Sequence, residues 1–237
     1  MKLLRYTVYI HLIGFLFAVC EDTSACNYME TGECEYYDVC GVCGGDGIID
    51  GFIDCEGSTI QDAINNYELG TIIIVPPGTY PEHLYIDQSV ILIGEEGAII
   101  DATGNYGGIN ISASNTVVSG FEIIGDEYTN YGIACEPGSD SLSISNNIIH
   151  GMQLPNSNLS PLSYGVLLYG DEGTNADPPE NVIIENNEIY NLSGTGISLG
   201  TETKNIQINS NYIHDINTIV FEGETISIGI QGILTEN

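Results

Sequence analysis

Basic residues are nearly absent from this chain of 237 residues, which has three Lys and Arg against 33 Asp and Glu and a formal net charge of −30. Such an excess of negative charge repels phosphate backbones and anionic membrane surfaces, which argues against a nucleic-acid-binding function. An acidic surface suits surroundings rich in salt or divalent cations, and it equally keeps an exported protein in solution.

Long apolar runs are also nearly absent, with one exception close to the N-terminus. Residues 9–18 (YIHLIGFLFA) follow Lys2 and Arg5, which is the pattern of an export signal, and the run is short for a membrane span. We expect a signal peptide at residues 1–18 and no membrane insertion after its removal. The mature protein is then secreted or held at the cell surface, with Lys204 as its only basic residue.

Helix-forming stretches are scarce, whereas Ile, Val, Thr, Tyr and Asn are abundant and 29 Gly residues punctuate the sequence. This composition favours short strands joined by tight turns, so we predict an all-β protein. The exception is STIQDAINNYELG at residues 58–70, where apolar residues recur at helical spacing between a start signal at Ser58 or Thr59 and a stop at Gly70. One short amphipathic helix is therefore expected.

Six of the seven cysteines are concentrated between residues 20 and 55. In an exported chain such a cluster predicts disulfides, here in a small module at residues 19–57 whose connectivity stays open. The six predicted disulfide residues are Cys20, Cys26, Cys34, Cys40, Cys43 and Cys55.

The stretch CEDTSACNYMETGECEYYDVCGVCGGDG, which begins at Cys20, resembles a short Cys-rich module of secreted proteins from marine bacteria. Two alternatives to the disulfide interpretation are a lipidated Cys20 and a zinc or redox pair formed by Cys40 and Cys43. Disulfides are favoured because Val19 is a poor residue before a lipoprotein cysteine, and because no second CxxC or nearby His completes a metal site.

A candidate calcium site follows in DGIIDGFID, where Asp46, Asp50 and Asp54 recur every four residues. The segment resembles the acidic loops of calcium-binding repeats, which makes calcium the one candidate cofactor. The spacing departs from the D-x-D-x-D-G pattern in which calcium ligands alternate along a loop.

A different organisation begins at residue 58. The stretch TIIIVPPGTYPEHLYIDQSVILIGEEGAIIDATG at 71–104 closely resembles the opening of right-handed parallel β-helices of the pectate-lyase-like superfamily. The resemblance implies that the short helix caps the first turn of the coil. We therefore predict a right-handed parallel β-helix over residues 58–237, with an N-terminal capping helix and a small disulfide-rich N-terminal module.

Two recurring motifs agree with a solenoid. The first is Gly followed by alternating apolar residues, at Gly108-Ile109, Gly132-Ile133, Gly165-Val166, Gly196-Ile197 and Gly229-Ile230. The second places an Asn between apolar positions in SLSISNNII (141–149), NVIIENNEI (181–189) and NIQINSNYI (205–213).

The second motif predicts a stack of asparagines. Asn tolerates the left-handed backbone that a sharp bend requires, so Asn147, Asn187 and Asn211 should sit at bends, one above another, with their amides hydrogen-bonded from turn to turn. Phe121 takes the aligned position one turn earlier, so the stack should begin after it.

In enzymes of the superfamily that this chain resembles, the substrate lies along the sheet that here corresponds to the Gly-Ile motif. Period-two alternation predicts inward side chains at Ile109, Ile111, Ile133, Cys135, Val166, Leu168, Ile197 and Leu199. It predicts outward side chains at Asn110, Ser112, Ala134, Glu136, Leu167, Tyr169, Ser198, Gly200 and Gln231. Because Glu136 is the only charged residue among these, this surface is expected to be poor in catalytic chemistry.

Loop residues supply the candidate ligand contacts. YGDEGTNADPPEN at 169–181 places Tyr169 beside Asp171, Glu172 and Asp177, and tyrosines next to carboxylates can stack on sugar rings and bind their hydroxyls. Together with Glu136 these are the predicted substrate-binding residues. The alternative is an ordinary solvated acidic loop.

Two further features receive structural interpretations. His150 and His214 occupy equivalent places two turns apart with Tyr190 between them, which predicts a surface stack too widely spaced to share one metal ion. Cys135, predicted to point inward, is interpreted as a buried free thiol.

Two functional hypotheses follow. The first is a secreted or cell-surface β-helix that binds polysaccharide or cell-surface glycan, or has a structural or adhesive role, without catalysis. The alternative is a polysaccharide lyase or glycoside hydrolase whose active groups lie in loops or beyond residue 237. Calcium is the candidate cofactor of such an enzyme. We also expect the coil to stop in mid-turn, so that it is either continued by further sequence or self-associates through its open end.

Overall fold

The computed structural model describes residues 59–66, 69–153, 163–170 and 177–216, together with the backbone of three strands at 219–221, 224–226 and 228–232. The interpretations made for the signal peptide, the Cys-rich module and Asp46, Asp50 and Asp54 lie outside the described residues, as do those for Asp171 and Glu172. Within the described residues, no helix is long and apolar enough to cross a membrane.

The predicted helix is α1 (Ile60–Asn66), which buries Ile60, Ala63 and Ile64. Thr59 is its N-cap, since its Oγ1 accepts a hydrogen bond from the Asp62 N–H at 2.9 Å. The Glu82 carboxylate accepts from the backbone N–H groups of Ile60 and Gln61 at 2.9 and 3.0 Å. These bonds satisfy N–H groups that a helix leaves unpaired, and they fix α1 on the first turn of the coil.

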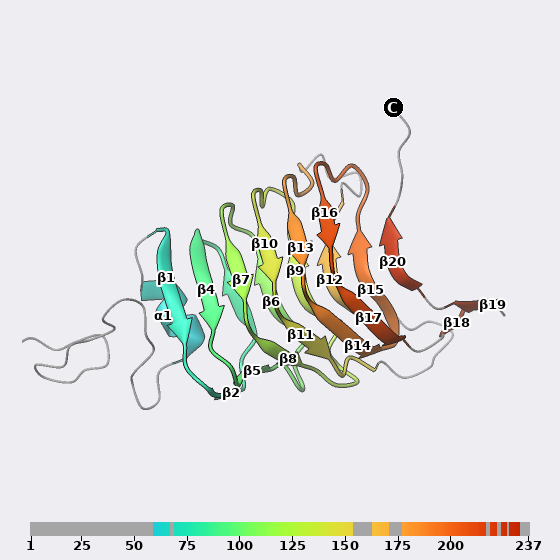
Figure 1. The fold of residues 1–237 in the computed structure, drawn as a ribbon, viewed down its shortest axis with the longest axis horizontal. Helices are drawn as coiled ribbons and strands as arrows, with labels where there is room; N and C mark the ends of the chain where they lie inside the picture. Colours follow the sequence, from blue (N-terminus) through green and yellow to red (C-terminus); the bar gives the residue numbers. More distant parts are fainter. Residues whose placement is uncertain are drawn as a thin grey trace, which may run out of the picture. The chain divides into compact units, whose positions relative to one another are not determined.

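The strands form three parallel sheets (Figure 1). The first sheet contains, in spatial order, β1 (Thr71–Val75), β4 (Val90–Gly94), β7 (Val117–Ser119), β10 (Ser143–Ser145), β13 (Ile183–Glu185) and β16 (Gln207–Asn209). The second contains β2 (Gly78–Tyr80), β5 (Ala98–Asp101), β8 (Glu122–Ile124), β11 (Ile148–His150), β14 (Glu188–Leu192) and β17 (Tyr212–Ile216). The third contains β3 (Leu84–Ile86), β6 (Gly107–Ile111), β9 (Tyr131–Cys135), β12 (Ser163–Leu168), β15 (Gly194–Leu199) and β20 (Ile228–Gly232).

Each sheet takes every third strand of the coil, so three consecutive strands make one turn, which we call a rung. The register aligns Ile133 with Ile109 on one side and with Val166 on the other, as the Gly-Ile motif predicted. Between β17 and β20, β18 (Ile219–Phe221) and β19 (Glu224–Ile226) form an antiparallel pair. The predicted parallel β-helix is therefore confirmed.

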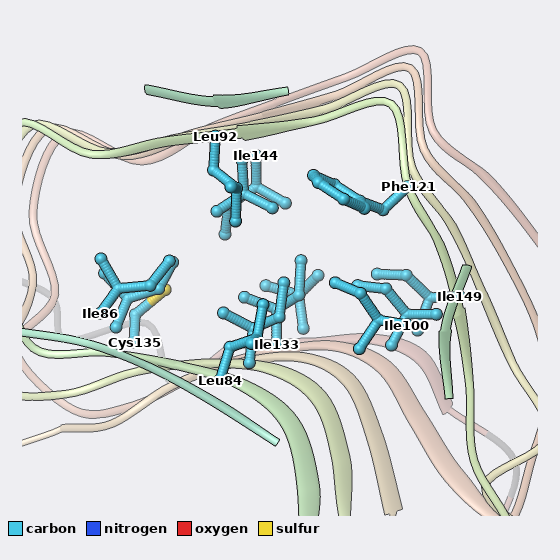
Figure 2. Packing of buried hydrophobic residues seen from close by; sticks show 14 of the residues in the cluster. Leu84, Ile86, Leu92, Ile100, Phe121, Ile133, Cys135, Ile144 and Ile149 are labelled. Atoms are coloured by element: carbon cyan, nitrogen blue, oxygen red, sulfur yellow. The ribbon is translucent and has the colours of Figure 1, made fainter. Parts of the chain in front are cut away.

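The core is a set of aliphatic columns inside the coil, and Figure 2 shows several of them. Leu84 and Ile133 belong to one column, while Ile86 and Cys135 belong to another, and all four are fully buried. Burying one such aliphatic side chain contributes about 1.5–3 kcal/mol. The predicted inward residues are confirmed, except that Leu199 is only partly buried.

The glycine of the Gly-Ile motif is required by close packing at the corner between the second and third sheets. A Cβ on Gly132 would lie 2.3 Å from Cγ2 of Ile149, and one on Gly165 would lie 2.5 Å from Cγ2 of Ile189. These positions therefore face the core, as the residues after them do. Strict period-two alternation is broken at this point, which changes the direction of the residues before each glycine.

The predicted asparagine stack is confirmed. The backbone N–H of Asn147 donates to Oδ1 of Asn187 at 3.0 Å, and that of Asn187 donates to Oδ1 of Asn211 at 3.0 Å. The N–H of Phe121 donates to Oδ1 of Asn147 at 3.1 Å, so the stack ends against the buried Phe121 ring as expected.

The backbone conformation assigned to these asparagines was wrong. The left-handed residues are the ones immediately before them, namely Asn146, Asn186 and Ser210, with φ of 57°, 56° and 53°. All three are exposed, whereas Asn147 and Asn187 are buried. Two neighbouring residues therefore have different roles at each bend. The exposed residue adopts the left-handed backbone conformation, and the Asn after it points its amide inward and forms the hydrogen bonds between rungs.

Candidate functional site

Aromatic side chains cover the outer side of the third sheet, which we call the tyrosine face. It is built from the first four rungs, through strands β3, β6, β9 and β12 and the residues next to them. It comprises His83, Tyr85, Tyr106, Asn110, Tyr131, Ala134, Glu136, Tyr164, Leu167 and Tyr169.

The broken alternation at the glycine motif places two of these tyrosines. Tyr131 and Tyr164 are paired across β9 and β12, each one residue before the glycine of its rung. Both pack in a cluster with Ala134 and Leu167 that is separate from the core inside the coil. The outward positions Ala134 and Leu167 therefore lie in a tyrosine cluster, which was not predicted from the sequence.

Gly107 gives Tyr131 its position. The two residues are aligned across β6 and β9, and a Cβ on Gly107 would lie only 2.1 Å from the Tyr131 ring. The ring therefore occupies the space that a side chain at 107 would fill.

Tyr131 is the buried centre of the face, with 3% of its surface exposed. Its hydroxyl lies 3.4 Å from Nε2 of His83 and 3.5 Å from Nδ2 of Asn110. Burial raises the pKa of Tyr131 and lowers the pKa of His83, so both groups are neutral at physiological pH. A neutral phenol can donate to a neutral imidazole, and this bond ties the first rung to the third.

Two other tyrosines of the face present their rings to solvent. Tyr85 is 56% exposed and Tyr106 is 61% exposed. Tyr106 packs edge-to-face on Tyr131 with 5.7 Å between ring centroids, and Tyr85 packs on His83 at 4.4 Å. Exposed rings held by ordered neighbours can stack on a flat apolar ligand surface at little cost in conformational entropy.

Glu136 and Asn110 supply the polar part of the face. Nδ2 of Asn110 donates to Oε1 of Glu136 at 2.7 Å, so the same amide connects the carboxylate to Tyr131. Burial, followed by the charge of Glu136, raises the pKa of Tyr169 to about 12, and its hydroxyl stays protonated. Sugar hydroxyls are well suited to such a mixture of phenol, amide and carboxylate groups.

Two carboxylates near the face are engaged elsewhere, and a third, the exposed Asp87, directly follows β3 two rungs from Glu136. Glu82 caps α1, and Asp126 accepts hydrogen bonds from the N–H groups of Gly104 and Tyr128 within its own corner. Glycoside hydrolysis needs two carboxyl groups across the scissile bond, and Glu136 is the single carboxylate among the residues of the tyrosine face. In the described part of the chain, no group of three or more His, Cys, Asp or Glu is gathered to hold a metal ion.

The sequence-predicted site residues are therefore only partly brought together. Glu136 and Tyr169 both belong to the tyrosine face. Asp177 lies at the corner between the third and first sheets, where its carbonyl accepts from the Gly138 N–H at 2.7 Å and its charge helps to raise the pKa of Lys204. Lys204 itself pairs with Glu180 at 2.8 Å.

Apart from Tyr169, the aromatic residues of the face were missed, although a sequence signal exists for some of them. Tyr131 precedes Gly132 and Tyr164 precedes Gly165, whereas in the rung before them Gly107 precedes the motif glycine and Tyr106 lies one residue earlier. A tyrosine before the glycine motif in two successive rungs indicates a repeated outward ring. His83 and Tyr85 carry no such repeat.

The predicted stack of His150, Tyr190 and His214 is confirmed on the outer side of the second sheet. The ring centroids lie 4.7 and 4.9 Å apart with nearly parallel planes. Both ring nitrogens of His214 meet carboxylates, Nδ1 at 2.9 Å from Asp215 and Nε2 at 3.0 Å from Glu188, and these bonds raise its pKa. The stack connects three rungs on the second sheet, whereas the tyrosine face belongs to the third sheet.

Comparisons with known proteins agree with this architecture. Residues 131–231 match the family model described as "Right handed beta helix region". The fold and this match together define the class of protein as a right-handed parallel β-helix.

One curated relative is a "Cell surface glycoprotein" of Methanothermus fervidus, 41% identical over 69 residues. The match covers 28% of this chain and 12% of the relative, so the chain spans a small part of that protein. No solved structure is significantly similar to the chain.

Proposed function

We propose that this chain is the β-helix part of a secreted or cell-surface protein that binds glycan on the tyrosine face without cleaving it. The observation that carries the proposal is a pair of exposed rings on one face, Tyr106 packed on the buried Tyr131 and Tyr85 packed on His83. Asn110 and Glu136 supply polar groups beside Tyr131. Flat rings next to polar groups are the usual means of holding a sugar.

The location and the fold relationship support the proposal in different ways. The predicted export signal and the name of the Methanothermus fervidus relative both favour the cell surface. The V-P-P-G-T-Y start supports a relationship to the pectate-lyase-like superfamily, in which ligands lie along the sheet that carries the tyrosine face here. The single carboxylate of this face favours binding over hydrolysis.

Binding is tested with the exported protein and a panel of neutral and uronate polysaccharides, by affinity electrophoresis and by calorimetry with oligosaccharides. Tyr85→Ala and Tyr106→Ala should each weaken binding about tenfold, the loss expected for one stacked ring. The matched control is Tyr212→Ala, because Tyr212 is 63% exposed but lies on the second sheet.

Equal losses of glycan affinity in all three variants would show that the loss does not depend on which sheet carries the tyrosine. The tyrosine face would then be rejected as the binding site. The same incubations are assayed for new reducing ends and for unsaturated products, with and without calcium. Appearance of either product would overturn the non-catalytic part of the proposal.

A further inference from the structure

The side chains of Asn110 and Glu136 leave two hydrogen-bond acceptors open on the tyrosine face. Nδ2 of Asn110 is directed to Oε1 of Glu136 and to the Tyr131 hydroxyl. Among the described residues, no partner is found for Oδ1 of Asn110 or Oε2 of Glu136. Two acceptors side by side suit a ligand that brings hydroxyl donors, and they oppose a ligand that brings a carboxylate.

The negative charge of the protein also opposes a ligand that carries a carboxylate. The whole sequence contains three Lys and Arg residues, of which Lys2 and Arg5 precede the predicted signal-peptide cleavage point and Lys204 is paired with Glu180. A uronate bound on the tyrosine face would bring its carboxylate into the field of Glu136 and of a strongly acidic protein. Screening by salt would weaken that repulsion, and a bridging cation would offset it.

We infer that the tyrosine face selects uncharged polysaccharides, with Glu136 as the residue that rejects uronates. The inference rests on the proposed glycan-binding function and adds the class of ligand to it. Asn110 holds the Glu136 carboxylate on the face, Tyr85 and Tyr106 bind the sugar rings, and the open acceptors receive hydroxyl groups.

The test uses matched ligands that differ only in charge. Galacturonan, glucuronan and alginate are each compared with their carboxyl-reduced, uncharged counterparts, at low ionic strength and with a chelator to remove divalent cations. The wild-type protein should bind at least one reduced polymer about tenfold more tightly than its uronate parent. Added salt should narrow the difference, because screening weakens charge repulsion.

Glu136→Gln identifies the residue responsible. The new amide keeps an acceptor for Asn110 and removes the charge. The affinities of this variant for the reduced polymer and for its uronate parent should therefore be nearly equal. The control is Glu96→Gln, which makes the same change in net charge at an exposed turn between β4 and β5. Under this variant the preference should stay close to that of the wild type.

Each outcome decides between the two proposals. Uronates bound as tightly as their reduced counterparts, or a preference equally changed by Glu96→Gln, would overturn the selection while glycan binding stands. Failure to bind any polymer of the panel would overturn the glycan-binding function and the selection with it. Binding of uronates only after calcium is added would agree with selection by charge, since calcium then supplies the cation that the chain does not.

Discussion

Oδ1 of Asn187 accepts two hydrogen bonds from Asn147, one from the backbone N–H at 3.0 Å and one from Nδ2 at 3.1 Å. The Asn187 amide in turn donates to the carbonyl of Ile144 at 2.9 Å. One side chain thus satisfies groups of a residue 40 positions earlier in the sequence. Because these groups are buried, no water can replace the bonds when the side chain is removed.

Replacing Asn187 with Leu should therefore lower the free energy of unfolding by about 2–4 kcal/mol, since several buried polar groups lose their partners. Urea unfolding followed by circular dichroism measures the change. Asn65→Leu on the exposed side of α1 is the control and should change stability by less than about 0.5 kcal/mol. A similar loss in both variants would contradict the importance of the stack.

Gly107→Ala tests how the tyrosine face is built. The added methyl group would collide with the Tyr131 ring, because the nearest atoms to a Cβ at this position all belong to that ring. Overpacking of this kind costs about 1–3 kcal/mol, so glycan affinity should fall about tenfold or more as the ring moves. Calorimetric titration with the best oligosaccharide measures the loss.

The matching control is the double variant Gly107→Ala with Tyr131→Ala. Once the ring is gone the methyl group has space, so adding Gly107→Ala to Tyr131→Ala should cause no further loss of affinity. If the two losses instead add, Gly107 does not act through Tyr131.

The stack on the second sheet predicts a dependence of stability on pH. Hydrogen bonds from His214 to Asp215 and Glu188 raise its pKa above the ordinary value of 6.5, so the fold favours the protonated imidazole. This stabilisation is fully present below about pH 6.5, the unfolded-state value, and is lost as pH rises through the folded-state pKa. The groups facing His214 are Glu188, Asp215, Tyr190 and Tyr212.

Urea midpoints of the wild type and His214→Gln should therefore differ most in mild acid and converge as pH rises. NMR titration of the ring gives the pKa directly, and Asp215→Asn should lower it. Asn is a suitable replacement because residue 215 has a φ of 49°, which Asn tolerates. A gap between wild type and His214→Gln that does not change with pH would refute the assignment.

Cys135 should be inert towards thiol reagents in the folded protein. It is a free cysteine in the core column with Ile86, and burial raises its pKa strongly, so almost no thiolate forms. Alkylation with iodoacetamide followed by peptide mass spectrometry should leave Cys135 unmodified in buffer and modified in urea. Rapid labelling in buffer would contradict the inward placement.

The sequence was sufficient to predict the parts of the fold that repeat. Gly132 and Gly165 recur with an aliphatic residue behind them, and Asn147 and Asn187 recur between buried isoleucines, so the rungs could be aligned by inspection. Each of these residues contacts the equivalent residue of the next rung. The sequence period alone is therefore enough to predict these contacts.

The tyrosine face could not be recovered in this way. Strict alternation from Ile133 backwards sends Tyr131 inward, whereas crowding between Gly132 and Ile149 breaks the alternation and turns the ring outward. That crowding depends on a side chain of another sheet, which no local pattern contains. His83 reaches the face from the first rung through a contact over 48 positions of sequence.

The register of the third sheet stays constant although successive glycine motifs lie between 24 and 33 residues apart, so segments of different length between the strands leave the pairing of the sheet unchanged. Inner and outer side chains are therefore under separate constraints. The buried columns tolerate few substitutions, whereas outward-facing side chains can be replaced in one rung without affecting the next. A lineage of such proteins could acquire new ligands by corner insertions and exchanges of outward rings, with the scaffold kept intact throughout.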